Sequence, residues 1–225
     1  MSRILFKNVH LIIDDYREYE NGAILFDEYK IIEVYVHSNK IFDDIDAKTI
    51  DLNNKILMPS FFDTSLLDDK QIIVDPLNIS NINSDKKIVL GNTSALAKQV
   101  NIDYDGFYNL FVDMSGFDYK DFGLVNLAFE NNDKYVEIDG SLDKSILNVV
   151  YKLIRKDHLI LIGDIEAGVK KLFDLKVPYS DILAFSSLNA YRFFDMDKTY
   201  GSLIKGKKSK FMIFDDDFNL IKEIN

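Results

Sequence analysis

The sequence contains no cysteine and only three histidines, and it has no long hydrophobic run. Without cysteine, a disulfide framework, a thiolate metal site and a cysteine nucleophile are all excluded. No window of about 20 apolar residues could span a bilayer. The short apolar stretch near the N-terminus meets Asp14, Asp15 and Glu18 almost at once, which is untypical of a signal peptide. These absences favour a cytoplasmic protein with no membrane association.

Basic residues are outnumbered by acidic ones. The chain has 27 Lys and Arg against 37 Asp and Glu, a formal net charge of -10 at pH 7. Nucleic-acid backbones are bound by clustered Lys and Arg, so we expect no nucleic-acid partner. The acidity is explained by solubility alone. With 225 residues and 47% hydrophobic content, the chain is expected to form one large domain or two small ones.

Short β-rich runs occupy both ends of the chain. In the N-terminal part they cover residues 4–6, 22–26, 31–36 and 49–52, and in the C-terminal part residues 210–214 and 220–224. This pattern predicts one small β-sandwich domain formed by residues 1–55 and 198–225.

The middle of the chain alternates strands with helices. Strands are predicted at 87–90, 107–112, 135–138 and 159–162, and helices at 93–100, 122–130, 167–175, 180–194 and directly after a capping Asp143. This order is typical of parallel βα units. Residues 56–197 are therefore predicted to form a second, α/β domain.

A polar residue follows each predicted parallel strand. These residues are Asn92, Asp113, Asp139 and Asp164. The carboxyl ends of parallel strands form the ligand-binding face of such folds. An aspartate at this point is often only the N-cap of the next helix, but a polar residue after every strand favours a binding pocket. The pattern does not specify the chemistry of that pocket.

Eight segments, in order along nearly the whole chain, carry a resemblance to a known family. They are LMPSFFDT (57–64), LGNTSA (90–95), YNLFVDM (108–114), KDFGLV (120–125), IDGSL (138–142), LIGDI (161–165), SLNAYR (187–192) and YGSLIKGK (200–207). In the same order they resemble PGFID, GHSNA, THLFNAM, REPGLVG, ADGIH, LVTDAM, SLNPAR and YGSIKPGK of the N-acetylglucosamine-6-phosphate deacetylases, a family of the amidohydrolase superfamily.

The resemblance implies a β-sandwich joined to a (β/α) TIM-like barrel. A complete barrel needs about 250 residues, and segment 56–197 is far shorter. The missing length falls between residues 64 and 87, where only 71–75 resembles a strand, and after Asp164. The expected fold class is therefore α/β, with a truncated, incomplete barrel and a small β-sandwich from both termini. Strand edges left by the missing units would be covered in a homodimer.

The resemblance also implies which chemistry has been lost. The family holds a divalent metal, such as zinc, through a glutamate and two histidines, and uses an aspartate as general base. The two histidines correspond to Asn92 and Asn109, the glutamate falls in the missing stretch, and the aspartate survives as Asp164. An asparagine oxygen is a weak ligand for a transition metal, so no metal or other cofactor is expected. Asp164 remains the one candidate catalytic residue, with a helix cap or a ligand contact as the alternatives.

Candidate ligand-binding residues are Asn92, Asn109, Lys120 and Asp139. Lys120 replaces the arginine of REPGLVG, keeping the charge but not the bidentate fork that suits a phosphate. Two functions stay open. The first is a non-hydrolytic homologue, a pseudoenzyme that binds a sugar phosphate, another small molecule or a partner protein. The second is an active hydrolase of amino-sugar metabolism that cleaves the amide bond of N-acetylglucosamine 6-phosphate with a remodelled site. A chain that folds without a selected role is a third possibility.

Overall fold

The computed structural model describes residues 2–36, 42, 44–64, 70–73, 87–90, 110–112 and 136–224. It divides the chain into two compact units. The terminal unit consists of Met1–Phe62 and Lys176–Asn225, and the parallel unit consists of Asp63–Leu175. The helices expected at 93–100 and 122–130 lie outside the described residues. No helix of the described part is long and apolar enough to cross a membrane.

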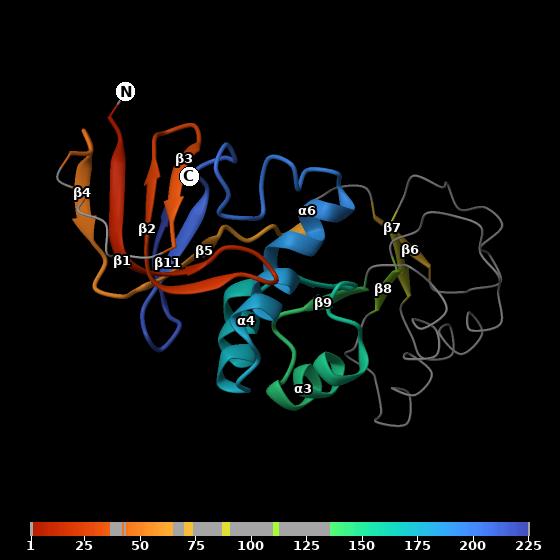
Figure 1. Cartoon of the computed structure of the whole chain (residues 1–225). Coiled ribbons are helices and arrows are strands. Elements are labelled where there is room, and N and C mark those ends of the chain that lie inside the picture. Colours follow the sequence, from red (N-terminus) through yellow and green to blue (C-terminus); the bar gives the residue numbers. More distant parts are fainter. Residues whose placement is uncertain are drawn as a thin grey trace. The chain divides into compact units, whose positions relative to one another are not determined.

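The terminal unit contains a seven-stranded mixed sheet built from both ends of the chain (Figure 1). Its strands are β1 (Ile4–Ile12), β2 (Glu18–Phe26), β3 (Ile31–Tyr35), β4 (Lys48–Asp51), β5 (Ile56–Pro59), β11 (Phe211–Phe214) and β12 (Leu220–Ile224). They follow the order β12-β11-β5-β1-β2-β3, and β4 also pairs with β1. All six β-rich runs predicted near the termini lie in or against these strands. β5 belongs to this sheet too, although its residues were assigned to the barrel segment.

Strand β1 changes partner along its length. Its first half pairs in parallel with β4, from Ile4 to Lys7, and its second half pairs in parallel with β5, at His10 and Leu11. Between the halves, Asn8 has a φ of 53°, a left-handed conformation that asparagine tolerates better than most residues. The pairing of β1 with β2 shifts register at the same place. A bulge at Asn8 thus lets one strand serve two neighbours.

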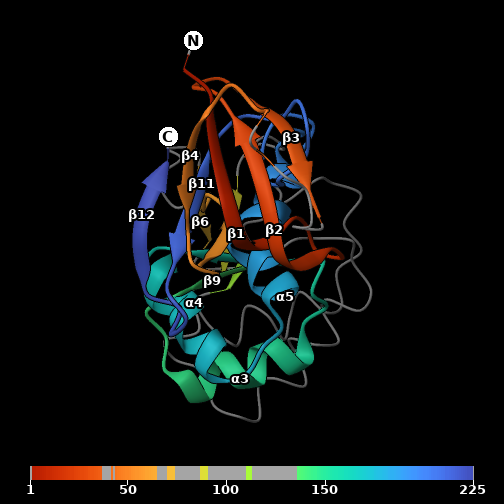
Figure 2. The same ribbon diagram turned by 60° about the vertical axis from the view of Figure 1, so that its left-hand side comes forward.

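The apolar core of this unit shows that the sheet folds over itself. The Phe26 ring of β2 lies 4.8 Å from the Phe211 ring of β11, and 4.9 Å from the Phe6 ring of β1. In a flat sheet, β2 and β11 would be separated by three strand spacings, or roughly 14 Å. The observed contact therefore requires strong curvature, which brings the inner faces of β2 and β11 together. Figure 2 shows the strands of this sheet from a second direction.

A continuous helical segment of the terminal unit contains a π turn. It comprises α5 (Tyr179–Leu183), η4 (Ala184–Leu188) and α6 (Asn189–Phe193), over the predicted helix 180–194. The backbone N–H of Phe62 donates to the carbonyl of Ser186 at 3.0 Å. The Ser187 hydroxyl donates to the carbonyl of Ser60 at 2.8 Å. These two bonds join segment 57–64 to Ser186 and Ser187. The first of them uses the Ser186 carbonyl, which in a regular α-helix would accept a bond within the helix.

The parallel unit contains a five-stranded sheet in the sequential order β10-β9-β8-β7-β6. Its strands are β6 (Lys70–Ile73), β7 (Lys87–Leu90), β8 (Leu110–Val112), β9 (Val136–Asp139) and β10 (Leu159–Ile162), and every pair is parallel. The prediction of parallel βα units is confirmed by these strands. Among the described residues, β6 pairs only with β7 and β10 only with β9, so no barrel closure is seen.

Two helices of the parallel unit are described. Helix α3 (Lys144–Leu153) follows β9, and α4 (Ile165–Asp174) follows β10. Asp143 occupies the N-cap position of α3, as predicted, but its side chain makes no capping hydrogen bond. The capping part of that prediction is therefore wrong. All four residues of β10 are buried, as expected for a strand covered on both faces.

Candidate functional site

The backbone brings the two described candidate residues to the same edge of the parallel sheet. Asp139 is the last residue of β9 and pairs in register with Ile162, the last residue of β10. Asp164 follows β10 after Gly163. Because neighbouring parallel strands end at the same edge, both aspartates lie at the carboxyl ends of β9 and β10. We call the residues 139–142 after β9 the β9 loop.

Asp139 is held against the turn that follows β10. Its Oδ1 accepts a hydrogen bond from the backbone N–H of Ser141 at 2.7 Å. A Cβ placed on Gly163 would lie only 3.0 Å from Asp139 Oδ2, and Gly163 has a φ of +66°. A glycine is therefore required at position 163, both for the backbone conformation and for room beside the carboxylate.

Asp63, which lies 100 residues before Gly163 in the sequence, contacts the same turn. Its Oδ1 accepts a hydrogen bond from the backbone N–H of Gly163 at 3.2 Å. Asp63 and Asp139 thus both contact Gly163, which brings two carboxylates to one backbone position. Sequence reasoning noticed Asp63 only as part of the segment 57–64 and gave it no role.

A buried polar pair lies next to these residues. The Thr64 hydroxyl donates a short hydrogen bond to Oε1 of Glu137. Thr64 is 0% exposed and Glu137 is 1% exposed. Glu137 and Asp139 are two residues apart on β9, so their side chains project to the same face of the sheet. Sequence reasoning missed Glu137, for which the only signal was an acidic residue inside an apolar strand.

Asp164 serves as the N-cap of α4. Its Oδ1 accepts a hydrogen bond from the backbone N–H of Ala167 at 3.2 Å. This is the helix-cap alternative considered from the sequence. The residue is exposed, so the cap leaves the carboxylate in contact with solvent.

The other candidate residues, Asn92, Asn109 and Lys120, lie outside the described residues. The two described histidines have partners elsewhere in their own units. His10 lies in β1 of the terminal unit, where its Nε2 is 2.7 Å from Glu18 Oε1. His158 precedes β10, at the amino end of that strand, and its Nε2 lies 3.9 Å from Asp157. His37 lies outside the described residues.

The described side chains do not fit a zinc site. Within the described ranges, no group of three or more His, Asp or Glu is placed to hold a metal ion. Among the described residues, the carboxyl ends of β9 and β10 present carboxylates from Asp63, Asp139 and Asp164, but no imidazole. Zinc in proteins is held mainly by histidine and cysteine, with carboxylates as additional ligands.

Comparison with known proteins shows the fold class of this chain. No family model matches the sequence, and no curated protein matches it. Among solved structures, it is similar to N-acetylglucosamine-6-phosphate deacetylase from Pasteurella multocida, with a TM-score of 0.64 and 12% identity over 98% of this chain and 97% of that one. A β-aspartyl dipeptidase from Fervidobacterium islandicum AW-1, solved with a β-Asp-Leu dipeptide, gives a TM-score of 0.72 and 12% identity over 100% and 95% of the two chains.

A third amidohydrolase structure is also similar. Dihydropyrimidinase from Brevibacillus agri gives a TM-score of 0.56 and 9% identity over 99% of this chain and 92% of that one. The chain therefore has an amidohydrolase-like fold. Since enzymes of several specificities match at identities this low, the structural likeness does not single out the deacetylases.

Proposed function

We propose that this chain is a non-hydrolytic relative of the N-acetylglucosamine-6-phosphate deacetylases, with a truncated barrel. Its function is to bind a small polar ligand, such as a sugar phosphate, at the carboxyl ends of its parallel strands. The order of the eight resembling segments and the amidohydrolase-like fold support the family assignment. The shortness of segment 56–197 supports the truncation.

The hydrogen bond of Asp164 carries the proposal. Asp164 is the one residue of the family's catalytic set that this sequence keeps, and its carboxylate caps α4 through the N–H of Ala167. An N-cap stabilises a helix whether or not the protein catalyses a reaction. The persistence of Asp164 is therefore explained without catalysis.

The remaining histidines support the same conclusion. Hydrolysis by the family mechanism needs imidazole ligands to hold a metal that activates water. Of the three histidines, His158 lies at the amino end of β10, and His10 bonds to Glu18 within the terminal unit. His158 therefore supplies no ligand at the carboxyl end of that strand, and within the described residues no group of three or more His, Asp or Glu is placed to hold a metal.

The chemistry of the strand ends indicates the kind of ligand. Asp63 and Asp139 are half-buried carboxylates, and Asp164 is exposed. Ionised carboxylates only accept hydrogen bonds, so they suit the hydroxyl and amide donors of an amino sugar. A phosphate on that sugar would need a cation, for which we assign Lys120.

Calorimetric titration with N-acetylglucosamine 6-phosphate tests this function, alongside assays of acetate release and of tightly bound metal. We expect binding without acetate release. Asp139→Asn should weaken binding roughly tenfold or more, because a hydrogen bond to a charged group is worth about 1.5–3 kcal/mol. Asp143→Asn is the matched control, since Asp143 lies close in sequence and its side chain makes no capping bond. Metal-dependent acetate release that is lost in Asp164→Asn would overturn the proposal, as would the absence of binding.

A remodelled hydrolase is the competing function, and one observation favours it. Asp63 accepts a hydrogen bond from the Gly163 N–H, and the Asp139 carboxylate lies beside the same residue, so two carboxylates, a residue type used in general acid–base catalysis, border one backbone position. Acetate release in the presence of a chelator, with a bell-shaped pH dependence that Asp63→Asn removes, would establish this function instead.

We also propose that the chain forms a homodimer through its parallel unit. Within the described residues β10 has one strand partner, and an edge strand tends to be paired or covered. Light scattering should give twice the monomer mass at micromolar protein concentration. A monomer mass at that concentration would remove this proposal and leave the ligand-binding function unaffected.

A further inference from the structure

Lys171 makes an unusual set of contacts in the parallel unit. Its Nζ donates to three consecutive backbone carbonyls of the β9 loop, those of Gly140 at 3.0 Å, Ser141 at 2.9 Å and Leu142 at 2.9 Å. A lysine ammonium has three N–H donors and no acceptor. Three carbonyl acceptors therefore match the whole donor capacity of the group.

The convergence of these carbonyls is a property of the loop. Successive carbonyls alternate in direction along a strand and run parallel to the axis in a helix, so in neither do three in a row meet at one point. Backbone carbonyls that converge are the ligands with which proteins bind potassium ions. We propose that the β9 loop is a monovalent-cation site, which the protein fills with the ammonium of its own Lys171.

The amides of the loop are fixed by other partners, and this leaves the carbonyls free to converge. The N–H of Gly140 donates to the carbonyl of Ile162 at 2.9 Å, and the N–H of Leu142 donates to the carbonyl of Asp139 at 3.2 Å. The N–H of Ser141 donates to the Asp139 carboxylate. The loop is thus held from its donor side by β10 and Asp139, and from its acceptor side by Lys171.

Close packing of α4 against the loop brings Lys171 into reach. A Cβ on Gly168 would lie 2.8 Å from the Cα of Gly140, so the helix backbone approaches the loop directly. Gly168 and Lys171 are three residues apart and therefore lie on the same face of α4. The absence of a side chain at position 168 lets α4 approach the loop, and Lys171 Nζ reaches the loop carbonyls.

Neighbouring lysines show that this contact is selective. Lys170 and Lys144 lie 3.6 Å and 3.5 Å from the carboxylate of Asp174. Asp174 is also three residues from Lys171, a spacing at which the two side chains could form an ion pair on α4. The Lys171 ammonium is instead placed on three uncharged carbonyls, as expected if those carbonyls form a cation site.

The tethered cation has a consequence for ligand binding, and this step rests on the proposed function. The Asp139 carboxylate accepts a hydrogen bond from the Ser141 N–H. The carbonyls of Ser141 and of its two neighbours, Gly140 and Leu142, accept hydrogen bonds from Lys171. Loss of the cation would loosen the loop and with it the orientation of the Asp139 carboxylate. Lys171 is thus a positioning residue for Asp139.

Thermal unfolding of Lys171→Ala in different salts of equal ionic strength tests the cation site. We expect the Tm to fall by roughly 3–6 °C, as a loss of one to two net hydrogen bonds would produce in a chain of this size. Ammonium and potassium chloride should recover at least half of that loss, and choline chloride should recover none. Wild type and Lys170→Ala should respond alike to all three salts. An unchanged Tm, or equal recovery in choline, would overturn the proposal.

Two further measurements separate the possible failures. If Lys171→Ala does not fold, Lys171→Gln is refolded in the same salts instead, because its amide keeps two hydrogen-bond donors. An equal yield of folded protein in all salts counts against the cation site. Titration with N-acetylglucosamine 6-phosphate is then repeated in ammonium and in choline, where only ammonium should restore the affinity of Lys171→Ala. If wild type does not bind the sugar phosphate, the proposed function fails while the salt-specific Tm result still decides the cation site.

Discussion

Each of the two units is stabilised internally by its own kind of contact. In the terminal unit, segments far apart in sequence meet through apolar rings and backbone bonds. The ring contact of Phe26 with Phe211 is one example, and the bond from Leu203 N–H to the carbonyl of Ile13 is another. In the parallel unit, the strand ends are fixed by carboxylates, by one lysine and by glycines at very short range.

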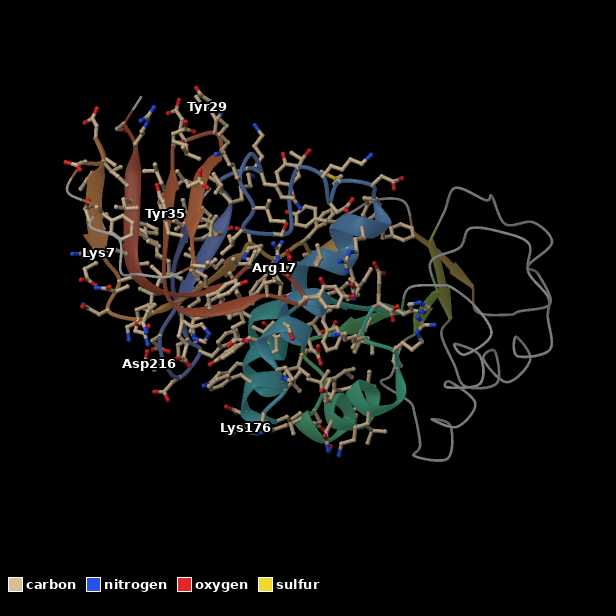
Figure 3. All side chains as sticks on the ribbon, in the orientation of Figure 1. Lys7, Arg17, Tyr29, Tyr35, Lys176 and Asp216 are labelled. Carbon is tan, nitrogen blue, oxygen red and sulfur yellow. The ribbon has the colours of Figure 1, made fainter. Side chains whose placement is uncertain are left out.

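This difference indicates which positions of each unit tolerate substitution. Apolar cores accept altered side chains at a moderate cost if volume is kept, because neighbouring residues adjust. Where two backbones touch directly, no side chain can move to make room for an added atom. We therefore expect the scaffold of the terminal sheet to tolerate substitution, and the strand ends of the parallel sheet to depend on a few residues. Figure 3 shows the side chains as sticks, with Tyr29 labelled in the turn between β2 and β3 of the terminal unit.

The largest effect should come from Gly140→Ala in the parallel unit. The added Cβ would lie 2.0 Å from the carbonyl oxygen of Asp164, a backbone atom that cannot rotate away. We expect a loss of about 3 kcal/mol or more in the free energy of unfolding, seen as faster hydrogen exchange of the β9 and β10 amides.

Gly206→Ala in the terminal unit is the matched control for that variant. Gly206 has a φ of +91° but nothing within 4 Å of an added Cβ, so only backbone strain of about 1–2 kcal/mol is expected. If Gly140→Ala and Gly206→Ala lowered the free energy of unfolding equally, the close backbone contact at Gly140 would not be what makes that position sensitive.

A second test is the buried ion pair of the terminal unit. Arg192 binds Asp15 with both guanidinium nitrogens, at 2.8 Å and 3.1 Å, and Asp15 is 5% exposed. Arg192→Met leaves this carboxylate unpaired and should destabilise the protein by about 2–3 kcal/mol, less than for a fully buried pair. Urea unfolding measures the change. The double variant with Asp15→Asn should recover part of it, because no charge is then left buried.

An exposed pair provides the comparison for Arg192. Lys205 Nζ lies 2.6 Å from Glu33 Oε2, with 67% of the lysine side chain and 39% of the glutamate side chain exposed. Lys205→Met should leave the urea midpoint nearly unchanged, because an exposed ion pair is screened by solvent. A loss as large as that of Arg192→Met would show that burial is not what makes the Asp15 pair important.

Much of the fold could be predicted from the sequence, because the pattern of apolar residues reports local structure. The β10 strand was evident from four successive apolar residues, and the common edge of Asp139 and Asp164 followed from the geometry of parallel strands. β1 and β2 were predicted too short, since polar residues such as Asn8 and Glu20 interrupt their apolar runs.

What could not be predicted depends on contacts between distant segments. The π turn of η4 is tied to the bond between Phe62 N–H and the Ser186 carbonyl, which no local pattern reveals. The burial of Glu137 depends on Thr64, 73 residues away, and a glutamate in a strand normally indicates an exposed position. Lys171 likewise has the sequence context of any solvent-exposed helix lysine, and only the structure places it on the β9 loop.

Alkaline pH should affect the terminal unit more than the parallel unit. Burial, together with the charges of Tyr200 and Glu223, raises the pKa of Tyr191 from 10.0 to about 12. A raised pKa in the folded state means that Tyr191 contributes stability below pH 10, and that this contribution is lost as the pH rises through 12. We expect a loss of about 1–2 kcal/mol that Tyr191→Phe largely removes, measured by chemical unfolding at several alkaline pH values. An unchanged pH dependence in Tyr191→Phe would assign the alkaline loss to other groups.

A small stability effect is expected at Asp164, where it decides between the two interpretations of that residue. Asp164→Ala removes the N-cap of α4 and should cost about 1 kcal/mol, whereas Asp164→Ser keeps a capping oxygen and should cost a few tenths. If Asp164 is only a cap, Asp164→Ser also keeps the affinity for N-acetylglucosamine 6-phosphate. If the carboxylate binds ligand, the serine variant is stable but loses affinity, since a hydroxyl replaces a charged acceptor. Measuring stability and affinity in the same two variants therefore separates a role of Asp164 in capping α4 from a role in binding the ligand.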